Sequence, residues 1–135
     1  MTANEILAKV KGLNLPADSY VVFGSAPMAV AGIREANDID LVVSSEVLEK
    51  LKQAGWKRIK KDDDDQPLTH DVFEVHDSWG FDSSYRPTLQ HLLVTATIVD
   101  GVAFASLEEV LKWKTVSARP KDLADIELID KYLKN

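Results

Sequence analysis

The chain of 135 residues contains no cysteine. Disulfide bonds and thiolate metal sites are therefore excluded as means of holding the fold or a cofactor. Basic residues are also in deficit, because 16 Lys and Arg stand against 22 Asp and Glu and give a net charge of −6. This balance argues against nonspecific nucleic-acid binding through the whole surface, although it leaves a local basic patch open.

A long hydrophobic run is missing as well. The segment 1–15 mixes its apolar residues with Glu5, Lys9 and Lys11. We therefore expect neither a signal peptide nor a membrane span, and we predict a cytoplasmic protein without a membrane partner. Hydrophobic residues make up 45% of the chain, which at this length suffices for one core. The prediction is a single domain over residues 1–135.

Apolar spacing and turn residues predict a small mixed sheet backed by helices. Pro27 and Pro120 suit first helical turns, Ser44 or Ser45 suits an N-cap, and Asp100-Gly101 suits a tight turn between strands. In chain order, the pattern predicts a helix ending near residue 12, a strand over 19–25, a helix over 27–36, a strand over 38–44, a helix over 45–55, strands over 69–79 and 91–106, and helices over 106–118 and 119–135.

Two carboxylates open the predicted strand 38–44, in the sequence Asp38-Ile39-Asp40. Because side chains alternate along a strand, Asp38 and Asp40 share one face, and their charges repel unless a cation lies between them. Oxygen ligands of this kind suit Mg²⁺ or Mn²⁺. For an isolated Asp-x-Asp, a turn followed by a solvated carboxylate is the commoner interpretation.

Gly24-Ser25 lies thirteen residues upstream, between a predicted strand and a predicted helix. Glycine lets a ligand approach the backbone closely, and a helix N-terminus favours an anion such as phosphate. Taken alone, the pair is a weak signal, because small residues fill many such turns for steric reasons.

Taken together, the stretch FGSAPMAVAGIREANDIDLVV resembles the core motif of the DNA-polymerase-β type nucleotidyltransferase superfamily. The segment LKWKTVSARPKDLADIELI is similar to the C-terminal part of small bacterial members, including antibiotic-modifying and toxin-type enzymes. The resemblance implies a mixed α/β (α+β) sheet of the nucleotidyltransferase type, with helices mostly on one face. It also implies two divalent metals, held by Asp38, Asp40 and a third acid, and phosphate contacts at Gly24 and Ser25.

The third acid is expected on a neighbouring strand, where the sequence offers Asp71, Glu74 and Asp77. We predict Glu74, as metal ligand and general base, because Phe73 and Val75 would face the core and leave Glu74 on the other face. A histidine metal site with His70 and His76 is a weaker alternative, since two histidines and one glutamate on a single strand do not converge on one ion. His76 is better placed near the acceptor.

Basic residues near the junction of the last two predicted helices have two interpretations. By spacing alone, Lys114, Arg119 and Lys121 complement a helix C-terminus, but the resemblance implies that they bind the triphosphate. Arg34 either closes the same pocket or pairs with Glu35. The acidic run in KKDDDD is interpreted as a solvated loop.

The function predicted is Mg²⁺- or Mn²⁺-dependent transfer of a nucleoside monophosphate from an NTP to an acceptor hydroxyl, with release of pyrophosphate. The alternative is a catalytically silent nucleotide-binding subunit of a two-protein system. The acceptor class stays open between a small molecule, a tRNA end and a protein, and a homodimer or a partner subunit is compatible with the sequence.

Overall fold

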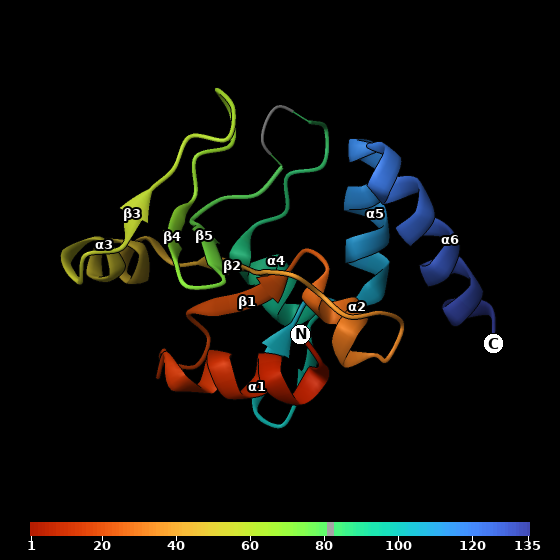
Figure 1. The fold of residues 1–135 in the computed structure, drawn as a ribbon, viewed down its shortest axis with the longest axis horizontal. Coiled ribbons are helices and arrows are strands. Elements are labelled where there is room, and N and C mark those ends of the chain that lie inside the picture. Colours follow the sequence, from red (N-terminus) through yellow and green to blue (C-terminus); the bar gives the residue numbers. More distant parts are fainter. Residues whose placement is uncertain (81–82) are drawn as a thin grey trace.

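The computed structural model describes residues 1–80 and 83–135, which form six helices and one seven-stranded sheet (Figure 1). The helices are α1 (Ala3–Gly12), α2 (Ala26–Val30), α3 (Ser45–Gln53), α4 (Leu89–Val94), α5 (Leu107–Ser117) and α6 (Pro120–Lys134). The strands are β1 (Tyr20–Phe23), β2 (Ile39–Val43), β3 (Lys57–Arg58), β4 (Leu68–His70), β5 (Phe73–His76), β6 (Thr97–Val99) and β7 (Val102–Phe104). This confirms the mixed α+β fold that the sequence predicts.

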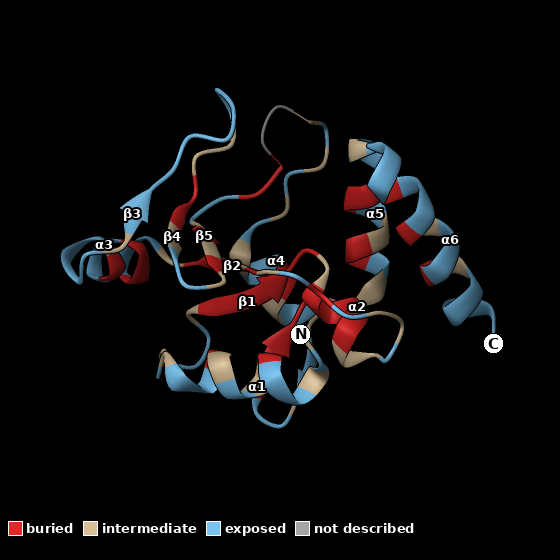
Figure 2. Cartoon of the chain, viewed as in Figure 1, coloured by how far each residue is buried: buried red, intermediate tan, exposed pale blue. Residues whose placement is uncertain are grey.

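The sheet has the strand order β3-β4-β5-β2-β1-β7-β6. Two neighbouring pairs are parallel, β2 with β5 and β1 with β7, and the others are antiparallel. Asp100-Gly101 forms the predicted turn between β6 and β7, with both residues at positive φ. The central strands β1 and β2 are almost wholly buried, which Figure 2 shows in red. Strand pairing in the middle of this sheet therefore aligns side chains from distant parts of the chain.

Alternating side chains of the central strands feed two apolar clusters on the two faces of the sheet. Val22 and Leu41 pack in one cluster with side chains of α1, α2 and α3. Val21 and Val42 pack in the other with side chains of α4, α5 and α6.

In the part of the chain that the structure describes, no helix combines the length and the apolar character needed to cross a bilayer.

The strands predicted over 91–106 are wrong for residues 91–94, where the chain forms the end of α4. Thr88 caps this helix, since its hydroxyl accepts a hydrogen bond from the amide of His91 at 3.0 Å. Leu92, a residue of this helix, is fully buried. A capped turn with a buried leucine outweighs the strand preference of the following Val and Thr residues.

Two other predicted elements differ in extent. The strand predicted over 69–79 is the hairpin of β4 and β5, because Asp71 takes a positive φ of 53° and reverses the chain. The helix predicted over 27–36 ends after Val30, where Gly32 takes a φ of 81°. Local left-handed residues thus divide or shorten runs that their apolar pattern alone would continue.

Helix α6 buries only part of the face that its apolar spacing indicates, together with two carboxylates. Apolar spacing indicates that Leu123, Ile126, Ile129 and Leu133 face the core, but Leu123 is 57% exposed and Leu133 is also exposed. The buried residues of α6 are Asp122, Asp125 and Ile129. Buried carboxylates require hydrogen-bond donors or cations as partners, and basic residues of the candidate site provide them.

Candidate active site

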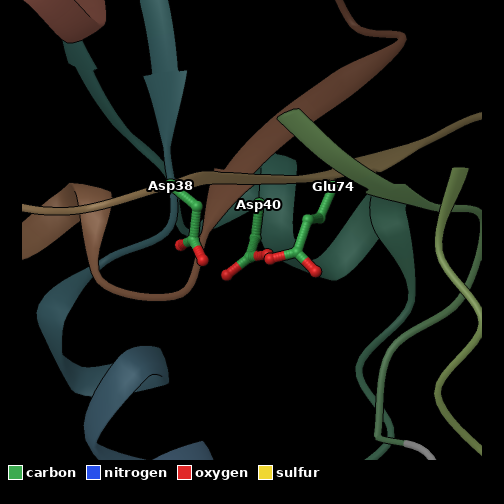
Figure 3. A group of neighbouring side chains, drawn as sticks. All are labelled: Asp38, Asp40 and Glu74. Carbon is green, nitrogen blue, oxygen red and sulfur yellow. The ribbon is translucent and has the colours of Figure 1, made fainter. Parts of the chain in front are cut away.

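Three carboxylates converge where β2 and β5 lie side by side (Figure 3). Asp38 immediately precedes β2, Asp40 lies within it, and Glu74 is paired with Asp40 in the parallel register of β2 and β5. One oxygen of each carboxylate lies within 4.8 Å of the others. The arrangement follows from the strand period, because Phe73 and Val75 point into the core and leave Glu74 on the opposite face.

The other acids considered for the third position lie elsewhere. Asp71 sits in the β4–β5 turn, where Lys9 of α1 donates a hydrogen bond to it at 2.7 Å. Asp77 follows β5 and lines a neighbouring cavity. His70 lies on β4, and its ring contacts that of Trp56 at a centroid distance of 5.1 Å. His76 shares β5 with Glu74, but His70 lies on β4, so the three residues do not lie on one strand as the sequence pattern predicts.

The electrostatics of the three carboxylates favour a bound cation. Burial, together with the charges of Asp38 and Glu74, raises the pKa of Asp40 well above its ordinary value. Burial and the neighbouring Glu74 also raise the pKa of Asp38. Three acidic oxygens at this spacing, with no nitrogen or sulfur ligand among them, match the donors that Mg²⁺ and Mn²⁺ prefer. The residues present therefore fit a divalent ion.

Gly24 ends the β1 segment against this cluster. Its φ of +70° lies in the left-handed region, and any Cβ atom at position 24 would collide with the carboxylate of Asp40. The glycine that the sequence associates with a phosphate thus has a second role, because it makes room for a metal-ligand candidate.

Ser25 does not cap a long helix, since α2 has only five residues and the Ser25 side chain makes no capping hydrogen bond. Its hydroxyl instead accepts a hydrogen bond from Arg34 at 2.7 Å, and the ammonium of Lys114 lies 3.5 Å away. Phosphate binding at Gly24 and Ser25 stays a prediction.

A buried carboxylate, Asp125, pairs with two basic residues of the site. Asp125 accepts two hydrogen bonds from Arg34, each at 2.8 Å, and one from Lys114 at 2.9 Å. Burial opposes ionisation, but these donors hold the pKa of Asp125 below its usual value. The network joins α5, α6 and the loop after α2 behind Ser25.

Asp122, like Asp125, pairs with basic side chains, in this case with two that are predicted to bind the triphosphate. It accepts a hydrogen bond from Nε of Arg119 at 2.7 Å, and Lys114 lies 3.6 Å from its other oxygen. Lys114 is only 4% exposed, yet it is among the residues that line the cavity containing the three carboxylates. Arg119 is half-exposed and, like Lys121, lines the cavity that contains the three carboxylates.

The site is a cavity of about 170 Å³ whose lining combines the three carboxylates with the basic residues Arg34, Lys114, Arg119 and Lys121. A larger cavity of about 660 Å³ adjoins it, and both are lined by His76 and Trp79. Burial, together with the charges of Lys61 and Arg58, lowers the pKa of His76 to about 4. His76 is therefore neutral near pH 7.

Four residues of the site escape sequence reasoning: Lys61, Asp65, Asp122 and Asp125. Asp122 and Asp125 are spaced by three on α6, but the apolar residues between them suggest a different inner face. The segment LKWKTVSARPKDLADIELI, which carries part of the resemblance to small nucleotidyltransferases, contains both acids, and it is the signal that could have found them. Lys61 and Asp65 belong to the charged segment interpreted as a solvated loop, yet both line the carboxylate cavity.

The fold is similar to that of the nucleotidyltransferase ANT(2'')-Ia, in its crystal structure with adenylyl-2''-tobramycin. The TM-score is 0.56 and the sequence identity is 17%, and the match covers 96% of this chain and 86% of that one. No protein-family model matches the sequence, and no curated protein matches it. At such low identity the likeness concerns the fold alone, and we conclude that the chain has a nucleotidyltransferase-like fold.

Proposed function

We propose that the chain, as a single nucleotidyltransferase-like domain over residues 1–135, transfers a nucleoside monophosphate from an NTP to an acceptor hydroxyl and releases pyrophosphate. The observation that carries the proposal is the convergence of Asp38, Asp40 and Glu74 within 4.8 Å, in a cavity that basic residues also line. A metal-bound triphosphate is the ligand whose charges complement both the acidic and the basic residues of this lining. The similarity to ANT(2'')-Ia, crystallised with an adenylylated tobramycin, supports the same class of reaction.

Asp38, Asp40 and Glu74 would hold a Mg²⁺ or Mn²⁺ ion, which when bound would supply Lewis-acid stabilisation of the phosphate charge. Glu74 has the second task of general base. The acceptor oxygen attacks the α-phosphorus, the bond from that phosphorus to the pyrophosphate oxygen breaks, and Glu74 accepts the hydroxyl proton.

Arg119 and Lys121 would bind the triphosphate tail, since both line the carboxylate cavity and Arg119 is half-exposed. A guanidinium binds phosphate through two parallel donors, whereas an ammonium acts as a point charge. Lys114 would act from behind, because it is buried between Asp122 and Asp125. These charges would stabilise the leaving pyrophosphate.

The acceptor would bind in the larger adjoining cavity. Its lining includes Arg58, Asp77 and Arg86, and it meets the carboxylate cavity at His76 and Trp79. An acceptor hydroxyl in this cavity would approach the α-phosphate from the side of Glu74. The charges of both signs around it favour a polar acceptor.

The test is to incubate the protein with Mg²⁺ and each labelled NTP, with and without pools of small hydroxyl compounds, tRNA or protein, and to measure pyrophosphate release. We expect release that depends on the metal and is lost in Asp40→Asn. Metal-dependent NTP binding without release under any condition would favour the silent nucleotide-binding subunit instead.

A further inference from the structure

Lys61 places an ammonium group on the carboxylate cluster. It lies in the loop between β3 and β4, and its Nζ forms an ion pair with Oε1 of Glu74. Its charge also acts on Asp38, Asp40 and Asp65. The ammonium group of Lys61 therefore supplies positive charge at the place where a metal ion would neutralise the three carboxylates.

The loop holds this position through hydrogen bonds of its own. The amide of Lys61 donates to the carbonyl of Asp65 at 2.8 Å, and a carboxylate oxygen of Asp62 accepts from the amides of Asp64 and Asp65 at 2.8 and 2.9 Å. These bonds lie within the turn and do not depend on the sheet. The backbone of Lys61 is thus fixed at the turn, while its half-exposed side chain is free to exchange Glu74 for water.

We propose that Lys61 is an internal competitor for the cation site, which partly neutralises the carboxylates until a divalent ion displaces its ammonium from Glu74. The inference rests on the proposed function, because it assumes that Asp38, Asp40 and Glu74 bind a metal. One ammonium leaves most of the negative charge of three clustered carboxylates uncompensated, whereas a divalent ion coordinates all three. Displacement is inexpensive because the flexible lysine stem reaches solvent.

The first test measures Mn²⁺ binding without nucleotide, by electron paramagnetic resonance of free Mn²⁺, in wild type, Lys61→Met and Lys60→Met. Methionine keeps an unbranched stem and removes the charge. Lys60 is a matched control, because it pairs with Asp63 in the same loop and both side chains are exposed. We expect Lys61→Met to bind Mn²⁺ about tenfold more tightly than wild type, because this substitution removes a positive charge from the site of the metal ion. Lys60→Met should bind Mn²⁺ with the affinity of wild type.

Asp40→Asn separates the possible failures. Equal Mn²⁺ affinity in wild type and Lys61→Met, lost in both when Asp40→Asn is added, would overturn the competition and leave the metal site standing. No Asp40-dependent Mn²⁺ binding in either protein would overturn both the competition and the metal-dependent function. Weaker binding by Lys61→Met would show that the lysine supports the metal and would also overturn the proposal.

The second test follows the lysine itself by limited acetylation and mass spectrometry, with and without Mg²⁺. Bound metal should raise the acetylation rate of Lys61 several-fold, because its amine leaves Glu74, and should leave the rate of Lys60 unchanged. A rate for Lys61 that does not respond, under conditions where Mg²⁺ is bound through Asp40, would overturn the displacement.

Discussion

A Cβ atom at position 24 would collide with Oδ2 of Asp40. The contact arises because Phe23, the residue before Gly24, pairs with Asp40 between the antiparallel strands β1 and β2. The glycine and the aspartate are sixteen positions apart in sequence but form one unit, in which the missing side chain creates the space for the carboxylate.

We predict that Gly24→Ala lowers both stability and metal affinity. The positive φ costs about 1–2 kcal/mol for any residue with a Cβ atom, and the collision displaces Asp40 from the other two carboxylates. Urea unfolding and Mn²⁺ titration measure the two effects. Gly32→Ala is the matched control, because Gly32 also has a positive φ but a Cβ atom there would have no neighbour within 4 Å. Similar Mn²⁺ affinity in the two variants would contradict the prediction.

We predict that Glu74→Gln weakens Mn²⁺ binding at least tenfold and abolishes pyrophosphate release, because it removes a ligand charge and the proton acceptor. Calorimetric titration with Mn²⁺ measures the first effect. Asp71→Asn should bind Mn²⁺ like wild type, since Asp71 pairs with Lys9 outside the carboxylate cluster. Loss of binding in Asp71→Asn but not in Glu74→Gln would reverse the assignment of the third acid.

We predict that Asp125→Ala destabilises the fold by about 3–5 kcal/mol, the usual cost of removing one partner from a buried ion pair. The cause is the charge of buried Lys114, which would keep only the more distant Asp122 as a partner, so adding Lys114→Met should recover part of the loss. Urea unfolding of the single and double variants measures this coupling. The exposed Glu127 of the same helix serves as control, and Glu127→Gln should change stability by less than about 0.5 kcal/mol. Additive effects of the two substitutions would refute the coupling.

We predict that Glu109 contributes stability that is lost in acid. Burial opposes its ionisation, but hydrogen bonds from Lys112, Tyr85 and His91 hold its pKa below the ordinary value. A carboxylate whose pKa is lowered on folding stabilises the protein above its unfolded pKa of about 4.3, and the contribution disappears as the pH falls through the folded pKa.

Glu109→Gln should therefore be less stable than wild type at pH 7, and the difference should narrow as the pH falls below about 5. Urea unfolding at a series of pH values measures it. Glu108→Gln, at the exposed neighbouring position, should follow the wild-type curve. A difference that stays constant from pH 7 to pH 3 would exclude an ionisation of Glu109 as its cause.

Sequence reasoning succeeded where local chemistry decides the structure. The hydroxyl of Ser44 accepts a hydrogen bond from an amide three residues ahead, as expected for a helix N-cap, and Asp100-Gly101 turns between β6 and β7. The alternation in Ile39-Asp40-Leu41 also predicts correctly which side chains face the core. Each of these outcomes depends on residues only a few positions apart.

Sequence reasoning failed where packing overrides a local preference. Residues 91–94 lie in a helix because Thr88 caps α4 and Leu92 fills the core on that face of the sheet. On α6 the apolar spacing pointed to Leu123, yet the helix turns Asp122 and Asp125 inward because Arg119, Lys114 and Arg34 pair with them. An ion pair between distant elements leaves no periodic trace in the apolar pattern.

A glycine turn before a strand opened by two same-face aspartates follows from residues a few positions apart, because alternation and turn conformation are properties of the local chain. Which acid joins the two aspartates, and which cation approaches them, depends on tertiary contacts. The parallel register of β2 and β5 sets Glu74 beside Asp40, and the loop after β3 brings Lys61 to Glu74. Strand pairing and loop closure join residues tens of positions apart, and such pairings are decided by the burial of the whole sheet rather than by any one segment.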